Sequence, residues 1–372
     1  MNLWLKHVDE VKVVAPIQNG TADLIDLPYK HEKLTFSEVP AFHLTSKKEA
    51  VKTLFKLPVV FVQIVRGMVW ADHIHLRCPG NMGLLGSVAQ IFFPHKPKTA
   101  KYAGNWDPDS PQPWSYRLQK KILSNTFLTR NMKVLVYGEW PEQSSNIVPF
   151  FTATYSEEEV SSFKFQERAS NFQPQTSNLQ PPTSNLQLPT SNFQLPTSNL
   201  LYVGALSPGK RPLLSIQTAE RLHKEGYEVH LDLFGEGVER PKLESYIKEN
   251  GLEDFVVLHG NQDADTVKRY YQNAHFLIFV SKSEGWPKVV AEAMFWGCLP
   301  ITTDVSCVNY MIGNGSRGKI VMPNVDDIVN KVKYYLENAD AFRQSSEEAM
   351  TWSRQFTLEK FEEEIGKLLY GN

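Results

Sequence analysis

The sequence predicts an α/β protein with two domains, each built on a doubly wound parallel sheet. The chain has 372 residues, enough for two domains of ordinary size that each bury a core. Between residues 200 and 303, short apolar runs of strand type alternate with longer stretches of helical type. This alternation is typical of a parallel sheet with helices on both faces. A weaker alternation of the same kind occupies residues 10–138.

The composition argues against several classes of function. The formal net charge is −2 with 22% charged residues, so electrostatics give no reason to expect nucleic acid or an anionic membrane as the main partner. Cys78, Cys298 and Cys307 have no metal-ligand spacing, and we expect them to be reduced and structural. We expect no signal peptide, and the longest apolar run, residues 57–70, is too short to span a bilayer. The expected location is therefore the cytoplasm.

The N-terminal half is expected to form the first domain, residues 1–165. Its strand-like runs are apolar or alternate in polarity. We predict strands at residues 10–16, 71–77, 99–104 and 134–138, and helices at residues 47–68 and 82–93. His73 and His75 fall on the same side of one predicted strand, because side chains alternate along a strand. A metal pair would need a third ligand and none is evident, so we interpret them as core or cleft histidines.

Residues 166–199 form a repetitive segment that we expect to be a linker. The dipeptide Ser-Asn recurs at positions 170, 177, 184, 191 and 198, a period of seven. Pro182, Pro189 and Pro196 recur in register and would each break a helix, which argues against a coiled coil. Low charge with abundant Pro, Gln, Ser and Asn predicts a disordered or extended chain, with an r.m.s. span of about 30 Å. The repetition suggests a tandem duplication in the coding sequence.

The second domain is expected over residues 200–355. We predict strands at residues 200–203, 229–234, 255–258, 274–280 and 299–303, and helices at residues 212–224, 240–249, 266–273 and 287–296. Ligands of parallel sheets bind at the carboxyl ends of the strands, and Lys210, Gly235 and Glu284 all fall there.

The predicted strand 274–280 leads into a loop and a helix that carry Glu284 and Glu292. Pro287 suits the first helical position, where its missing N–H costs nothing. A helix N-terminus offers unpaired N–H groups and a positive dipole end, which suit a phosphate. Glu292 lies in an otherwise apolar helix, where a carboxylate is costly unless it is paired. Ligand hydroxyls, an arginine or a backbone amide could each pair with it.

This segment resembles the donor-site signature of the retaining glycosyltransferases of family 4, whose GT-B fold has two Rossmann-like domains facing a cleft. Those enzymes carry two glutamates with seven residues between them, and Glu284 and Glu292 match this pair. The resemblance implies that Glu284 is catalytic and contacts hydroxyls of the donor sugar, while Glu292 binds the ribose. It also implies a UDP- or GDP-linked sugar as co-substrate, a glycan or lipid-linked acceptor, and no metal or other cofactor. A lipid-linked acceptor would place the enzyme at the inner face of a membrane, as a peripheral protein.

The loop 204–210 also resembles the family, and Lys210 matches a lysine that would neutralise the donor diphosphate. We assign donor binding to Lys210, Gly204, Gly235, Gly285, Trp286, Lys288, Val289 and Glu292. Ala205 stands where the family usually has an arginine, so one phosphate cation is missing, and Arg211, Lys288 or a residue from the other domain could replace it.

The acceptor side departs further from the family. Ala103 stands where many relatives have a histidine near the reacting sugar, and the adjacent candidates for acceptor contacts are Asn105, Trp106 and Asp107. The sequence Asp107-Pro108-Asp109 imitates a metal motif of GT-A enzymes, but its surroundings favour a turn. Only residues 1–7 precede the first predicted strand, whereas the family has another strand and a glycine loop there. We expect that the reading frame begins upstream or that the protein is a remnant.

The C-terminal residues 356–372 are predicted as a helix that packs back on the first domain, as in the family. Two alternatives to a transferase stay open. One is a catalytically inactive nucleotide-sugar-binding remnant, and the other is a GT-B sugar-nucleotide epimerase or hydrolase.

Overall fold

The computed structural model of this chain describes residues 2–17, 20, 26–41, 47–163 and 197–371. The chain divides into two compact units, one of residues 1–153 and 358–372 and the other of residues 154–357. Most of the predicted linker 166–199 lies outside the described residues, and its last residues, from Ser198, begin the first strand of the second unit. All three cysteines are buried and none forms a disulfide.

The first unit contains two parallel sheets. The larger has the order β3-β4-β5-β6, and β1 pairs only with β2 among the described residues. The strands are β1 (Val11–Ala15), β2 (Leu34–Glu38), β3 (Ile74–Cys78), β4 (Lys98–Tyr102), β5 (Met132–Val136) and β6 (Ile147–Pro149). The helices are α1 (Asn2–Leu5), α2 (Lys47–Trp70), α3 (Asn81–Ala89), α4 (Trp114–Leu123), α14 (Leu358–Tyr370) and the short 3₁₀ helix η1 (Gln90–Phe92).

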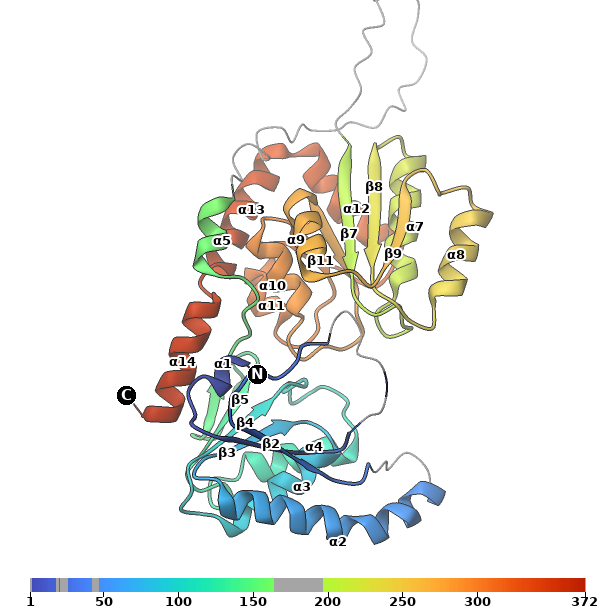
Figure 1. Ribbon diagram of the computed structural model, residues 1–372. Coiled ribbons are helices and arrows are strands. Elements are labelled where there is room, and N and C mark those ends of the chain that lie inside the picture. The colour runs from blue at the N-terminus through green and yellow to red at the C-terminus, as the bar shows by residue number, and fades with distance from the viewer. Residues whose placement is uncertain (1, 18–19, 21–25, 42–46, 164–196, 372) are drawn as a thin grey trace, which may run out of the picture. The chain divides into compact units, whose positions relative to one another are not determined.

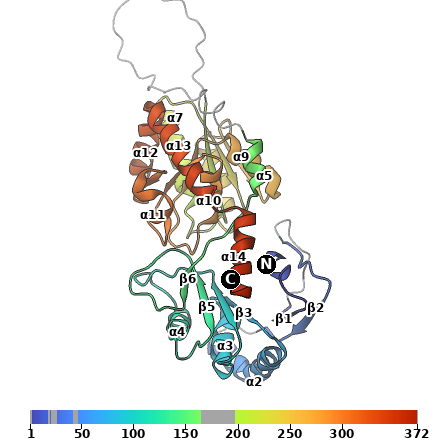
Figure 2. The same cartoon turned by 90° about the vertical axis from the view of Figure 1, so that its left-hand side faces the viewer.

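Alternation along β5 explains how both faces of the larger sheet are covered. Val134 and its neighbours on β3 and β4 pack against α2, whose Val60 and Ile64 are buried. Leu135 points the other way and packs with Phe150 and with Ile365 of α14, which lies beside this sheet (Figure 2). No helix among the described residues, not even the 24-residue α2, is both long and apolar enough to cross a membrane.

A mostly apolar cavity of about 360 Å³ is lined by both β1 and β3. All five residues of β1 border it, and so do Ile74–Arg77 of β3 and residues of α2 and α3. The predicted parallel strands are present, but the described strands divide between two sheets, because β1 pairs with β2 and β3 pairs with β4. Strand β3 also begins at Ile74 rather than at residue 71, because pairing with β4 starts there.

Two glycines of α3 should respond differently to replacement by alanine. A Cβ on Gly83 would lie 2.7 Å from the carbonyl oxygen of Arg77, which is backbone and cannot move freely. A Cβ on Gly86 would lie 2.9 Å from a methyl group of Leu76, and the side chain of Leu76 borders the cavity and has room to shift. We expect Gly83→Ala to lower the free energy of unfolding by about 1–3 kcal/mol. Gly86→Ala should cost much less, because the gain in helix propensity offsets the shift. Urea unfolding of the two variants checks this, and equal losses would contradict it.

The second unit has one six-stranded sheet in which every pairing is parallel, with the order β12-β11-β10-β7-β8-β9. The strands are β7 (Ser198–Val203), β8 (Val229–Phe234), β9 (Val256–Gly260), β10 (Phe276–Phe279), β11 (Leu299–Thr302) and β12 (Lys319–Ile320). The helices are α5 (Glu157–Ser162), α7 (Pro212–Lys224), α8 (Arg240–Glu249), α9 (Ala264–Asn273), α10 (Lys288–Phe295), α11 (Val308–Met311), α12 (Val325–Glu337), α13 (Ala339–Ser353) and the short η2 (Gly313–Gly315).

Helices flank the sheet of the second unit on both faces, as Figure 1 shows. The chain builds β7, β8 and β9 outward in one direction, and then returns to place β10 on the other side of β7. The order of strands therefore reverses between β7 and β10. A crevice for ligands forms at such a reversal, outside the carboxyl ends of the two strands.

Candidate functional site

The candidate site lies where the loops after β7, β8 and β10 meet. The amide of Lys282, after β10, donates to the carbonyl of Gly209, after β7, at 2.8 Å. The amide of Leu206 donates to the carbonyl of Glu236, in the loop after β8, at 2.9 Å. These bonds place the predicted site residues Lys210, Gly235 and Glu284 of three separate loops at the reversal between β7 and β10.

Glycine is required where two of these loops touch. Gly235 has φ +133°, and a Cβ there would lie 2.0 Å from the carbonyl oxygen of Gly204. Gly237 has φ +158°, and a Cβ there would lie 2.3 Å from the carbonyl oxygen of Leu206. The main chains therefore approach more closely than any side chain allows. Gly204 begins the loop that carries Lys210, and Gly235 lets the loop after β8 pack against it.

Lys210 and Glu284 form an ion pair. Their side chains are 27% and 10% exposed, and the ammonium also lies 5.1 Å from the ring centre of Phe279. The nearby Arg211 has left-handed backbone geometry, with φ 52°, and its guanidinium donates to the carbonyl of Val280 at 3.2 Å. Arg211 is thus engaged with the end of β10, and Lys210 is the cation that faces the carboxylate of Glu284.

Helix α10 begins one residue later than the sequence predicts. Pro287 has ψ 84° and is the N-cap, so Lys288 is the first helical residue. Proline at the N-cap has no side-chain acceptor for the first N–H groups of the helix, and the N-cap side chain makes no capping bond. The preceding Gly285 is held by its carbonyl, which accepts from the hydroxyl of Ser306 at 2.7 Å. This holds the loop 285–287 against the chain that follows β11.

Glu292, one turn into α10, is paired within the protein. Its Oε1 accepts from the hydroxyl of Thr154 at 2.9 Å and lies 3.2 Å from the ammonium of Lys288. Its Oε2 accepts from the phenol of Tyr271 at 3.3 Å. The side chain of Glu292 is 12% exposed. The prediction that this carboxylate needs partners is therefore confirmed, but the partners differ from those expected, and Thr154 and Tyr271 carry no sequence signal for the role.

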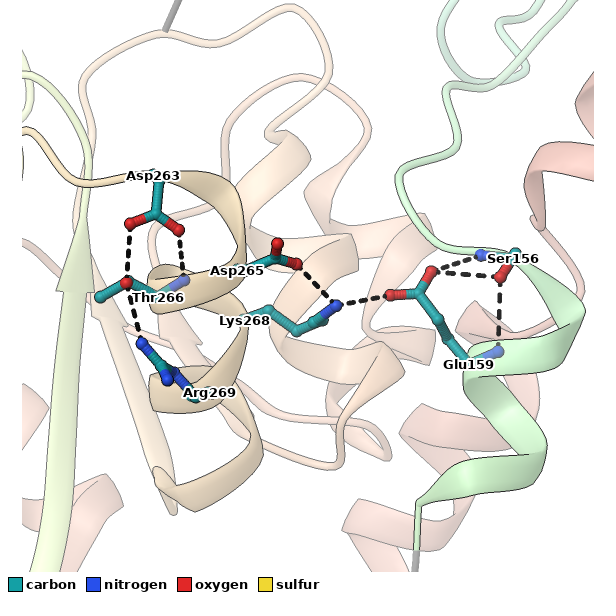
Figure 3. A network of polar contacts seen from close by, with 7 residues as sticks. All are labelled: Ser156, Glu159, Asp263, Asp265, Thr266, Lys268 and Arg269. Carbon is teal, nitrogen blue, oxygen red and sulfur yellow. Dashed lines mark hydrogen bonds and ion pairs between the residues drawn. The ribbon is translucent and has the colours of Figure 1, made fainter. Parts of the chain in front are cut away.

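A polar network joins α5 to α9 beside these partners (Figure 3). Ser156 and Glu159 form a capping box at the start of α5, in which each accepts from the backbone N–H of the other. The second carboxylate oxygen of Glu159 lies 3.0 Å from the ammonium of Lys268 on α9, which also contacts Asp265 at 2.9 Å. The segment that carries Thr154 is thereby fixed to the helix that carries Tyr271.

The predicted acceptor-side residues belong to the first unit, where they form a turn. Asn105 accepts from the amide of Asp107 at 2.9 Å, and Asp107 accepts from the amide of Asp109 at 2.9 Å. Trp106 is 5% exposed, and the ammonium of Lys120 lies 5.3 Å from its ring centre. The turn predicted at 107–109 is confirmed. The role of Asn105, Trp106 and Asp107 in acceptor binding stays a prediction.

His73 and His75 in the first unit share one hydrogen-bonding partner. The rings of His73 and His75 lie 2.9 Å and 2.8 Å from the hydroxyl oxygen of Thr99. Burial lowers the pKa of His75 to about 3, so this ring is neutral. Across the described residues, no group of three or more His, Cys, Asp or Glu side chains is placed to hold a metal ion.

The sequence of the second unit is similar to a family model and to several curated proteins. Residues 189–352 match the family model of the glycosyl transferases group 1. These residues span most of the second unit. Similar curated proteins are the N-acetylgalactosamine-N,N'-diacetylbacillosaminyl-diphospho-undecaprenol 4-alpha-N-acetylgalactosaminyltransferase of Campylobacter jejuni and the lipopolysaccharide 1,6-galactosyltransferase of Salmonella typhimurium. The first is 29% identical over 174 residues, 46% of either chain. The second is 31% identical over 134 residues, 35% of this chain and 37% of the other. The chain thus matches less than half the length of these relatives.

Solved structures of other proteins share the fold. Anabaena HepE in complex with UDP has a TM-score of 0.64 at 14% identity, with 91% of this chain and 86% of that chain covered. Sucrose-phosphate synthase from Thermosynechococcus elongatus has a TM-score of 0.65 at 17% identity, with 97% and 88% covered. These likenesses confirm the predicted fold class, an α/β fold with parallel sheets of the GT-B type.

Proposed function

We propose that this protein is a retaining, metal-independent glycosyltransferase that moves a sugar from a nucleotide diphosphate to a glycan or lipid-linked acceptor. The observation that carries the proposal is the pairing of two lysines with two glutamates at the reversal of strand order. Lys210 pairs with Glu284, and Lys288 pairs with Glu292, both beside the N-terminus of α10. The diphosphate of a donor can pair with the two lysines. The hydroxyls of its sugar and of its ribose can donate hydrogen bonds to the two carboxylates.

The chemistry of this arrangement suits departure of a nucleotide diphosphate. The leaving group gains negative charge as the bond to the sugar breaks, and fixed donors that face it lower the barrier. Lys210, Lys288 and the N–H groups at the start of α10 are such donors. The resemblance at Glu284 and Glu292 to the retaining family supports the proposal that the anomeric configuration is retained.

The names of the relatives guide the choice of substrates. Crystal structures of the similar HepE contain UDP, and UDP with glucose, so UDP is the first nucleotide to test. The Campylobacter relative is named for an undecaprenol-linked acceptor and the Salmonella relative for lipopolysaccharide, which favours a lipid-linked glycan. We propose that the protein works on such an acceptor as a peripheral protein at the inner face of a membrane.

A binding protein without transferase activity is the second candidate. Ala205 supplies no cation in the loop after β7, and the guanidinium of Arg211 is engaged with Val280. A screen of UDP- and GDP-sugars with product detection separates the two. Transfer to a lipid-linked or glycan acceptor supports the enzyme. Binding without transfer or hydrolysis supports the second candidate, hydrolysis alone would indicate the hydrolase alternative, and no binding of any nucleotide sugar would overturn the site itself.

Replacing Lys210 tests the diphosphate contact. We expect Lys210→Met to weaken UDP binding by about 10- to 100-fold, because hydrogen bonds to charged groups contribute about 1.5–3 kcal/mol. Uridine, which has no phosphate, should bind the variant and the wild type equally. Isothermal titration measures both, with Lys248→Met, an exposed lysine of α8, as the matched control. Equal loss for UDP and uridine would show that the variant has lost its fold rather than a phosphate contact.

A further inference from the structure

Three donors from different segments surround the carboxylate of Glu292. Thr154 and Lys288 approach Oε1, while Tyr271 approaches Oε2. Thr154 lies on the segment before α5, Tyr271 lies on α9, and Lys288 shares α10 with Glu292. Because the two oxygens are held from different directions, the plane of the carboxylate is fixed.

The donors differ in how firmly they are held. The phenol of Tyr271 is fully buried, and burial together with the charge of Glu292 raises its pKa well above the usual range. This phenol stays protonated and can only donate to the carboxylate. The side chain of Lys288 is 55% exposed, so it can leave Glu292 at little cost when a ligand arrives.

Thr154 is braced by the network between α5 and α9. The capping box fixes the chain just after Thr154, and the ion pair of Glu159 with Lys268 at 3.0 Å ties that chain to α9 (Figure 3). Lys268 and Tyr271 lie three residues apart on α9, and residues at that spacing lie on neighbouring turns of one face. One network therefore positions the half-buried hydroxyl of Thr154 and the buried phenol of Tyr271 relative to Glu292.

We propose that Thr154 and Tyr271 are positioning residues that orient Glu292 to accept the two ribose hydroxyls of the nucleotide. This inference rests on the proposed function, since it needs a nucleotide in the site. A carboxylate has about four lone-pair sites. Thr154 occupies one lone-pair site on Oε1 of Glu292, and Tyr271 occupies one on Oε2. When Lys288 moves to the phosphates, one lone-pair site on each oxygen remains, and the two accept from the vicinal hydroxyls of a ribose. The arrangement thus selects ribonucleotides over deoxyribonucleotides.

The test compares UDP with 2'-deoxy-UDP and 3'-deoxy-UDP by isothermal titration. Wild type should prefer UDP by about tenfold over each deoxy form, the effect of one hydrogen bond to a charged group. Glu292→Gln should abolish most of this preference, and Tyr271→Phe and Thr154→Val should each reduce it to about threefold. Thr154→Ser, which keeps the hydroxyl, should restore it.

Tyr227→Phe is the matched control. Tyr227 is 2% exposed and its phenol donates to Glu337 at 2.5 Å, so this variant removes the same kind of bond elsewhere in the second unit. Its preference for UDP should equal that of wild type. If Tyr271→Phe does not fold, the Thr154→Val and Thr154→Ser pair decides.

Each outcome has a definite meaning. An unchanged preference in Tyr271→Phe and Thr154→Val, while Glu292→Gln loses it, overturns the positioning role and leaves the proposed function standing. A wild type that binds UDP without regard to the ribose hydroxyls overturns the role of Glu292 as well. A wild type that binds no nucleotide overturns the proposed function and this inference with it.

Discussion

A Glu284→Gln variant should lose sugar transfer while its affinity for UDP stays the same or rises. Glutamine keeps the size of the side chain but removes the charge, and the carboxylate of Glu284 is only 10% exposed beside Lys210. If Glu284 contacts the donor sugar in the transition state, the turnover number should fall by about 10²–10³, as for loss of one fixed electrostatic contact. UDP has no sugar, and its phosphates should gain from a Lys210 that is no longer neutralised.

The measurement pairs the rate of product formation with titration of UDP. Glu347→Gln, an exposed position on α13, serves as the control and should behave as wild type in both. Full activity in Glu284→Gln would contradict the assignment of Glu284 as the catalytic residue. A parallel loss of UDP affinity would instead indicate that Glu284 holds the loop rather than the sugar.

The largest effect on stability is expected from Gly235→Ala. Its φ of +133° is strained for any side chain, and the new Cβ would lie 2.0 Å from the carbonyl oxygen of Gly204. The new Cβ and the carbonyl oxygen of Gly204 belong to loops held by hydrogen bonds, so moving them apart would break some of these bonds. Strain and overpacking each cost about 1–3 kcal/mol, so we expect the free energy of unfolding to fall by about 3 kcal/mol or more.

Gly209→Ala is the matched control for this substitution. Gly209 lies in the neighbouring loop, a Cβ there would meet nothing within 4 Å, and its φ is not positive. We expect this variant to be neutral or slightly stabilised. Urea unfolding of both variants and UDP titration check the pair, and a Gly235→Ala variant as stable as Gly209→Ala would show that the two loops are not locked together.

The part of the site formed by the loop before α10 and by α10 itself could be predicted from the sequence, because the patterns that indicate it lie within one short segment. The apolar run 274–280 predicts a strand, and residues 276–279 form β10. The apolar helix after Pro287 and the spacing of Glu284 and Glu292 are likewise read within a dozen or so residues. The predicted start of α10 is wrong by one residue. The φ of Pro287 suits both the N-cap and the first helical position, and only its ψ shows that Pro287 is the N-cap.

The partners of Glu292 could not be predicted, because they depend on tertiary packing. Thr154 is 138 positions away in the chain, and Tyr271 is 21 positions away on another helix. A threonine before a capping box and a tyrosine in an amphipathic helix are ordinary residues when read alone. Only the register of α5, α9 and α10 brings them to one carboxylate.

The first unit shows another limit of sequence patterns. Leu34–Glu38 pairs with β1 as β2, but these five residues are mostly polar and carry a weak strand signal. The alternation of residues 10–138 predicts parallel strands, and the structure contains them. Which strands are neighbours is a separate matter, set by packing across the sheet, and the separation of β1 from β3 has no local signal.

The cavity lined by β1 and β3 bears on solubility. Within the described part of the chain, each of these strands pairs on one side only, and an unpaired edge beside apolar surface is a template on which another extended chain can add. Each strand also carries a cation that borders the cavity, Lys12 on β1 and Arg77 on β3. Charges on edge strands discourage such addition. We therefore expect these two charges to help the first unit resist aggregation, and partly unfolded molecules to associate first at these two edges.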